Sequence, residues 1–125
     1  MTRRSIEVSS FTHSNPIPAA SRIGPLLVSS VIVARDPAAT SVPDSAEAQY
    51  ANLFHHIGEM LAAGGADWRH VARITFYVPD AAFRDASNPV WIQHFPDPAS
   101  RPARHTQVVD GAKVASCEFI AYIDD

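Results

Sequence analysis

The chain has 125 residues, of which 46% are hydrophobic and 18% charged, and its formal net charge is -3. This length suits one domain with one hydrophobic core, and this composition excludes a disordered chain. The acidic balance excludes the basic surface stripe on which nucleic-acid binders depend. We predict a single domain over residues 1–125, with residues 1–4 as a flexible terminus and no nucleic-acid partner.

Three features concern the cellular compartment. The sequence holds no run of about 18 apolar residues, so we predict no transmembrane helix and no membrane partner. Glu7 and Ser9 follow Arg3 and Arg4 where a signal peptide would continue with apolar residues. The single cysteine, Cys117, excludes an internal disulfide bond. We therefore expect a cytoplasmic protein.

The first part of the chain predicts two strands separated by a loop. Residues 5–11 alternate loosely and suit a short strand, whereas the prolines in residues 12–21 favour an ordered loop. Residues 26–34 are rich in apolar and β-branched side chains, which predict a strand buried on both faces.

The strongest local pattern predicts a helix that begins after Asp44 or Ser45, either of which can cap it. Glu47 follows in the first turn, where a negative charge interacts favourably with the helix dipole. Gly64-Gly65 is expected to end the helix. Apolar residues at steps of three and four predict one buried face, made of Ala46, Tyr50, Leu53, Phe54, Ile57, Met60 and Leu61.

Residues 71–78 predict a second strong strand, and residues 81–95 predict a second helix or helical turns. Pro89 forces a new helical start within the latter segment. The apolar residues expected on one side of the strand are Ile74, Phe76 and Val78.

Residues 104–109 and 114–123 predict two further strands. Asp110-Gly111 lies between them and is typical of a hairpin turn, so we expect these strands to pair with each other. The predicted order is β-β-α-β-α-β-β. One mixed sheet with two helices packed on one face accounts for this order.

Arg104 is the first candidate for a ligand-binding residue. It stands at the start of a predicted strand, and Pro102 before it limits how the chain enters that strand. A guanidinium is planar, carries five donors and stays charged, so it suits two-point binding of a carboxylate. The alternative is a surface arginine in a salt bridge.

Glu118 is the second candidate, because it lies in a strand that is otherwise nearly free of charge. A carboxylate there is costly unless it is paired or hydrogen-bonded, and such residues mark functional sites. The alternative is a glutamate on an edge strand that faces water. Cys117 should face the opposite side as a small buried residue. Consecutive His55 and His56 cannot share one ligand-bearing helix face, so no metal site is predicted.

Several segments together resemble one known family, and Pro-Ala-Arg before a strand is the most specific of them. The chain resembles the RidA family, also called YjgF and once known as L-PSP endoribonuclease, over residues 15–123. The matching segments are residues 24–30, the helix with Gln49, Asn52 and Leu53, Ala63-Gly64, residues 71–78, Asn88, residues 102–104 and the strand around Glu118.

The resemblance implies a chorismate-mutase-like α/β (α+β) fold and a homotrimer with its sites in clefts between subunits. It implies hydrolysis of a 2-imino or enamine carboxylate to a 2-keto acid and ammonia, without metal or organic cofactor. Arg104 matches an arginine that holds the substrate carboxylate, and Glu118 matches a glutamate that positions or activates water. Ser30 matches a serine that lines the pocket, and Asn88 joins these residues as a substrate-binding position.

Two departures concern the substrate-binding positions. Ile17 stands where the best-known deaminases have a tyrosine, and Val31-Ile32 stands where they have Gly-Gln. The first change removes a hydrogen-bonding group, and the second removes a small residue beside the pocket. The sequence therefore leaves three hypotheses about function open. They are an imine deaminase, including a specialised one for a catabolic intermediate such as 2-aminomuconate; a non-catalytic carboxylate-binding regulatory trimer; and a ribonuclease, which the acidic balance disfavours.

Overall fold

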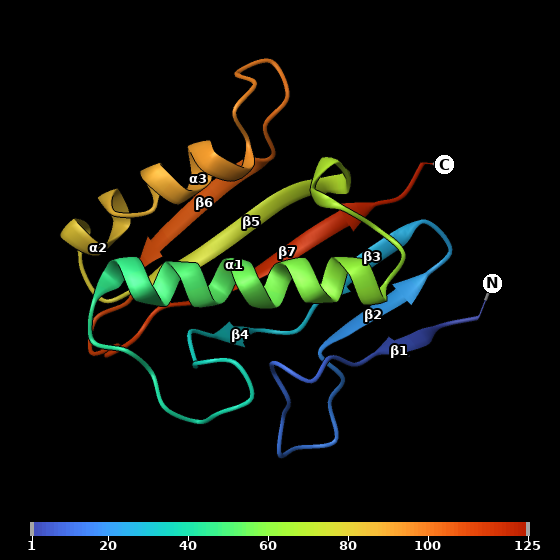
Figure 1. Cartoon of the computed structure of the whole chain (residues 1–125), viewed down its shortest axis with the longest axis horizontal. Coiled ribbons are helices and arrows are strands. Elements are labelled where there is room, and N and C mark those ends of the chain that lie inside the picture. Colours follow the sequence, from blue (N-terminus) through green and yellow to red (C-terminus); the bar gives the residue numbers. More distant parts are fainter. Residues whose placement is uncertain (1, 125) are drawn as a thin grey trace.

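The computed structural model describes residues 2–124, which form one mixed sheet with helices packed on one face (Figure 1). The strands are β1 Arg4–Ile6, β2 Ala20–Ile23, β3 Leu26–Ser29, β4 Ile32–Val33, β5 Val71–Val78, β6 Ala103–Val108 and β7 Ser116–Tyr122. The helices are α1 Ala46–Ala63, α2 Ala81–Asp85 and α3 Asn88–His94, with the 3-10 turn η1 Trp68–His70. Neighbouring strands follow the order β1-β2-β3-β7-β5-β6, and β4 pairs with β7. The predicted mixed sheet with helices on one face is confirmed.

Helix α1 and strand β5 have the predicted bounds. The side chain of Ser45 accepts a hydrogen bond of 3.1 Å from the backbone N–H of Ala48, which is the expected N-terminal cap. Gly64 forms the C-terminal cap. The predicted apolar side of β5 is fully buried against the helices, with Ile74, Phe76 and Val78 all at 0% exposure.

The N-terminal third differs from its prediction in three ways. Strand β1 begins at Arg4, inside the segment expected to be flexible, and β2 lies partly in the segment expected to be loop. Residues 26–34 form two strands, β3 and β4, separated at Ser30 and Val31. The segment 26–34 as a whole is not buried on both faces, since Leu26 is 42% and Val31 46% exposed. A turn at Gly24, which has a φ of 55°, pairs β2 with β3 as a hairpin. The side chains of these two strands therefore alternate between the two faces of the sheet.

The predicted hairpin between the last two strands is wrong. Strand β5 lies between β6 and β7, pairing parallel with β6 and antiparallel with β7. Gly111 does turn the chain, with a φ of 84°, but the turn crosses the end of β5. Helices α2 and α3 form the crossover from β5 to β6, and such a crossover is what a parallel pair requires.

The sheet has one covered face and one face turned away from the helices, which we call the open face. Cys117 and Phe119 of β7 lie under the helices, at 0% and 1% exposure, as predicted for Cys117. Glu118 and the intervening residues of β7 alternate onto the open face. Exposed apolar side chains of that face include Ile23 and Leu26, which lie opposite each other in the β2–β3 pair.

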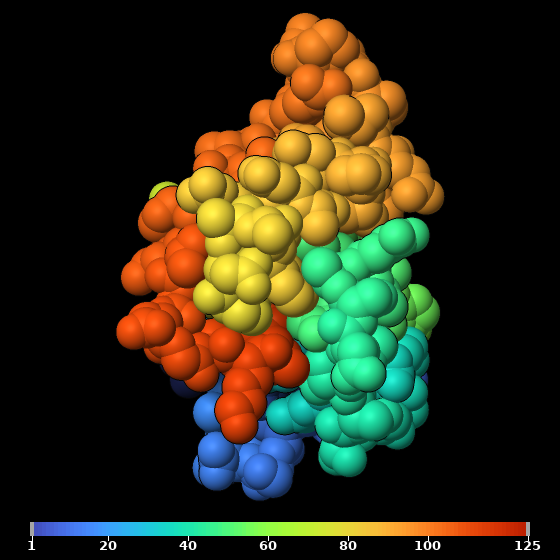
Figure 2. All heavy atoms as spheres, turned by 90° about the vertical axis from the view of Figure 1, so that its left-hand side faces the viewer, coloured from blue at the N-terminus to red at the C-terminus, as the bar shows by residue number. Residues whose placement is uncertain are grey.

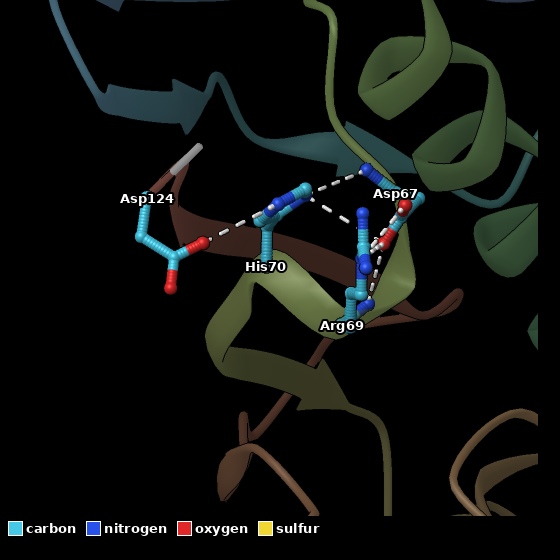
Figure 3. Close-up of polar contacts among 4 residues, drawn as sticks. All are labelled: Asp67, Arg69, His70 and Asp124. Carbon is cyan, nitrogen blue, oxygen red and sulfur yellow. Dashed lines mark hydrogen bonds and ion pairs between the residues drawn. The ribbon is translucent and has the colours of Figure 1, made fainter.

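Two peripheral features complete the fold. The connection 95–102 between α3 and β6 projects from the body and forms the narrow tip at the top of Figure 2. At the same end of β5, the ring of His70 accepts a 3.0 Å hydrogen bond from the backbone N–H of Asp67, and its other nitrogen lies 3.8 Å from Asp124 (Figure 3). This contact holds the segment after β7 against η1. None of the helices among residues 2–124 is long and apolar enough to cross a membrane.

Candidate functional site

Arg104 lies near the start of β6 and extends toward the N-terminus of α3. Its Nη1 donates to Ser87 Oγ at 3.1 Å, and its Nη2 donates to Asn88 Oδ1 at 2.9 Å. Ser87 is fully buried and its hydroxyl donates in turn to the Arg84 carbonyl at 2.8 Å, so its oxygen is fixed toward the guanidinium. Two neutral side chains thus orient Arg104, and Asn88 is one of the predicted site residues.

The charge of Arg104 is not neutralised by any carboxylate in residues 2–124, since Arg104 forms no ion pair there. Its guanidinium carbon lies 4.9 Å from the centroid of the Trp91 ring, a favourable cation–π contact. The salt-bridged surface arginine considered as the alternative is therefore not what the structure contains. The side chain is exposed, oriented, and left with donors for an anion.

Ser30 lies in the break between β3 and β4, and its hydroxyl donates to the Ala19 carbonyl at 2.9 Å. His13 Nε2 lies 2.7 Å from the same oxygen. Since the serine proton is already directed at a carbonyl, the histidine nitrogen must be the donor in this contact. Ser30 Oγ then has a remaining lone pair that can accept a hydrogen bond from a ligand.

Ser30 and Ile17 line one shallow depression of about 440 Å³ beside β2 and β3. Ile17 is 48% exposed, and Val31 next to Ser30 is 46% exposed. Three predicted substrate-binding residues therefore lie together at the end of β3, with two apolar side chains turned to the surface.

Glu118 lies on the open face in a separate depression of about 200 Å³. The Tyr77 hydroxyl donates to its Oε1 at 2.5 Å. Val28 and Ser29 line both this depression and the one that contains Ser30, so the two depressions adjoin along β3. The alternative of a glutamate on an edge strand is not borne out, because β7 is a central strand.

Within one chain the predicted site residues fall into two groups. Arg104 and Asn88 contact each other on the helix side of β6, an edge strand. Ser30, Ile17 and Glu118 lie around β3 and β7, which are three and two strands away from β6 in the sheet. No depression described for the chain is lined by members of both groups.

Sequence reasoning missed the side chains that hold these residues in place. Ser87 and Trp91 orient Arg104, His13 contacts Ser30, and Tyr77 contacts Glu118. A weak signal was available for Tyr77, because it alternates with the buried apolar residues of β5 and so belongs to its polar side. No group of three or more histidine, cysteine, aspartate or glutamate side chains within residues 2–124 is placed to hold a metal ion.

A model of the Endoribonuclease L-PSP family matches residues 9–118. The chain belongs to this family. Its curated relative Reactive Intermediate Deaminase A, chloroplastic, from Arabidopsis thaliana is 35% identical over 68 residues, which are 54% of this chain and 35% of the plant protein. The chain thus spans about a third of the length of that relative.

Solved structures show the L-PSP family fold along the chain. RidA from the Antarctic bacterium Psychrobacter sp. has a TM-score of 0.86 at 21% identity, covering 96% of this chain and 99% of that one. The YjgF gene product from E. coli has a TM-score of 0.84 at 19% identity, covering 95% and 98%. The RidA/YjgF membership expected from the sequence is confirmed.

Proposed function

We propose that the protein hydrolyses a small 2-imino or enamine carboxylate to a 2-keto acid and ammonia. The observation that carries this proposal is the oriented guanidinium of Arg104, which has no carboxylate partner among residues 2–124. Its fork of donors suits two-point binding of a substrate carboxylate. The name of the plant relative, a reactive intermediate deaminase, supports the same chemistry.

The reaction asks little of the protein beyond orientation. An imine carbon is already electrophilic, so the enzyme must hold it and supply a water molecule. In this proposal Arg104 fixes the carboxylate, which sets the angle of approach, and Glu118 positions the water. Ser30 Oγ accepts a hydrogen bond from the N–H of the reacting nitrogen. No metal or organic cofactor is required.

We propose that the site forms in a cleft between copies of the chain in a homotrimer. The two groups of site residues lie apart in one chain, and an edge group from one copy can meet the β3–β7 group of the next. The open face supports such an assembly, because Ile23 and Leu26 are 43% and 42% exposed there. Exposed apolar side chains gathered on one face are typical of an interface.

The test is the release of ammonia and keto acid from a panel of 2-imino acids generated in situ by an amino-acid oxidase. Wild type should accelerate the release, and Arg104→Ala should lose about a hundredfold of that acceleration, because the carboxylate is no longer held. Arg84→Ala is the matched control. Arg84 is an exposed arginine on α2, and it contacts the site through its backbone carbonyl, which the substitution keeps.

One other outcome would contradict the role of Arg104, and two would favour a different function. Equal turnover by Arg104→Ala and wild type would remove Arg104 from the site. No turnover, together with stabilisation of wild type but not Arg104→Ala by small carboxylates, would favour the regulatory carboxylate-binding trimer. Binding of RNA that weakens steeply with salt would favour the ribonuclease hypothesis.

A further inference from the structure

We propose that Tyr77 is a positioning residue for Glu118, holding one carboxylate oxygen so that the other receives the proton of the attacking water. The proposal rests on the deaminase function proposed above and adds to it a residue that its mechanism did not use. Four observations carry it, namely a short hydrogen bond, its direction, the strand register that fixes it and the open second oxygen of Glu118.

The register of strands β5 and β7 brings Tyr77 close to Glu118. Strands β5 and β7 pair antiparallel, with Thr75 opposite Glu118 and Tyr77 opposite Ser116. Tyr77 and Glu118 are thus diagonal neighbours on the open face, a separation that a tyrosine side chain can span. The 2.5 Å distance between Tyr77 Oη and Glu118 Oε1 is that of a charge-assisted hydrogen bond.

The direction of the bond is fixed by chemistry. A carboxylate ion can only accept a hydrogen bond, so the phenol of Tyr77 is the donor and Glu118 Oε1 the acceptor. The same contact raises the pKa of Tyr77 above its ordinary value, with burial and the negative charge of Glu118 adding to the effect. Tyr77 therefore stays protonated and remains a donor throughout the neutral range.

The second carboxylate oxygen is left for the reaction. Among residues 2–124 no donor lies within hydrogen-bond distance of Glu118 Oε2, and Glu118 lines the depression beside Ser29 and Thr75. The charged or titratable groups that face this depression are Arg73 of β5 and, by register, His105 of β6. Neither forms an ion pair with Glu118.

The step assigned to the pair is balanced. The water oxygen bonds to the imine carbon, the C=N π electrons move to nitrogen, and the water proton passes to Glu118 Oε2. Glu118 then gives this proton to the amino nitrogen. Glu118 Oε2 next accepts the remaining hydroxyl proton and delivers it to the same nitrogen. The C–N bond then breaks as ammonia leaves, and the electrons of the O–H bond form the C=O of the keto acid. Tyr77 keeps its own proton and supplies only orientation and charge stabilisation.

The kinetic test compares Tyr77→Phe with Tyr122→Phe and wild type. Both variants lose one hydroxyl from the sheet, but Tyr122 is 57% exposed and its hydroxyl has no hydrogen-bond partner among residues 2–124. We expect Tyr77→Phe to lower kcat by about tenfold with KM nearly unchanged, because a hydrogen bond to a charged group is lost. Tyr122→Phe should match wild type.

A spectroscopic test reads the contact without turnover. The ultraviolet absorbance of the phenolate follows the titration of Tyr77, and Glu118→Gln should move that titration to lower pH by removing the charged acceptor. An unmoved titration, or equal kcat for Tyr77→Phe and wild type, would overturn the proposal. If wild type itself releases no ammonia, the deaminase function fails first and the positioning role fails with it.

Discussion

His55 and His56 are adjacent on α1, yet their surroundings differ sharply. His56 is fully buried, and its Nε2 donates to the Arg35 carbonyl at 2.7 Å while Nδ1 accepts from the Ser10 hydroxyl at 3.0 Å. This arrangement satisfies a neutral ring. Burial lowers the pKa of His56, because the charged form would lose its water, and the hydrogen bond to Arg35 opposes this only in part.

Stability should therefore fall in mild acid. The pKa of His56 is lower in the folded than in the unfolded state, so below about pH 6.5 the unfolded state binds the extra proton first. Stability from this group is complete above that pH and decreases as the pH falls toward the folded-state pKa. Urea unfolding at pH 7.5 and 5.5 measures the loss, which His56→Gln should reduce and His55→Gln, a change at an exposed neighbour, should leave in place. Equal pH dependence in wild type and His56→Gln would contradict this origin.

At the scale of elements, Gly58 within α1 and Gly64 at its C-terminal cap separate the effect of glycine on backbone entropy from its effect on packing. A Cβ at Gly64 would lie 2.8 Å from Leu27 Cδ2 and 3.2 Å from the Met60 carbonyl, which is too close for any ordinary contact. A Cβ at Gly58 would lie 3.4 Å from the Trp68 ring, which is ordinary contact. The close approach of Leu27 from β3 thus requires glycine at the end of the helix.

The two substitutions should change the free energy of unfolding in opposite directions. Gly64→Ala should lower the free energy of unfolding by about 1–3 kcal/mol, because Leu27 is fully buried and has no room to move. Gly58→Ala should raise it by about 0.5–1 kcal/mol, since alanine loses less backbone entropy inside a helix. Chemical denaturation of both variants measures this, and stabilisation by Gly64→Ala would show that Leu27 can shift.

Local signals explain which elements could be predicted from the sequence. The apolar periodicity lies within α1 and its caps Ser45 and Gly64 directly flank it, and the alternation of β5 lies within β5, so both elements were predicted with their bounds. The pairing of the last two strands was not predicted correctly. Asp110-Gly111 indicates a turn, but whether β5 inserts between the turning strands depends on the crossover through α2 and α3, far away in sequence.

The same distinction holds for the candidate site. Arg104 and Glu118 could be singled out because each charge stands in an unusual local sequence. His13 could not be singled out, and Tyr77 only weakly by its place on the polar side of β5, because their importance comes from partners 17 and 41 residues away. These contacts were missed because the two partners are far apart in the sequence, and the types of the residues were not the reason.

At the scale of the whole molecule, the proposed trimer can be tested apart from catalysis. Leu26→Lys places a charge on the open face, where Leu26 is 42% exposed and pairs with Tyr122. Light scattering should give the mass of three chains for wild type and of one chain for this variant, because a buried unpaired charge is costly. Ala51→Lys is the control, since Ala51 is exposed on α1, on the covered side of the sheet, and the substitution should leave the trimer intact. A wild-type monomer would remove the proposed cleft.

Strand β7 also determines when the chain can fold during its synthesis. It comes last of the strands in sequence, yet it pairs with β3, β4 and β5 and joins the two halves of the sheet. A nascent chain that has reached only residue 109 has the N-terminal strands and β5–β6 with no strand to connect them. Their exposed edges are the kind that chaperones and neighbouring nascent chains can bind. The sheet therefore closes only after residues 116–122 have left the ribosome.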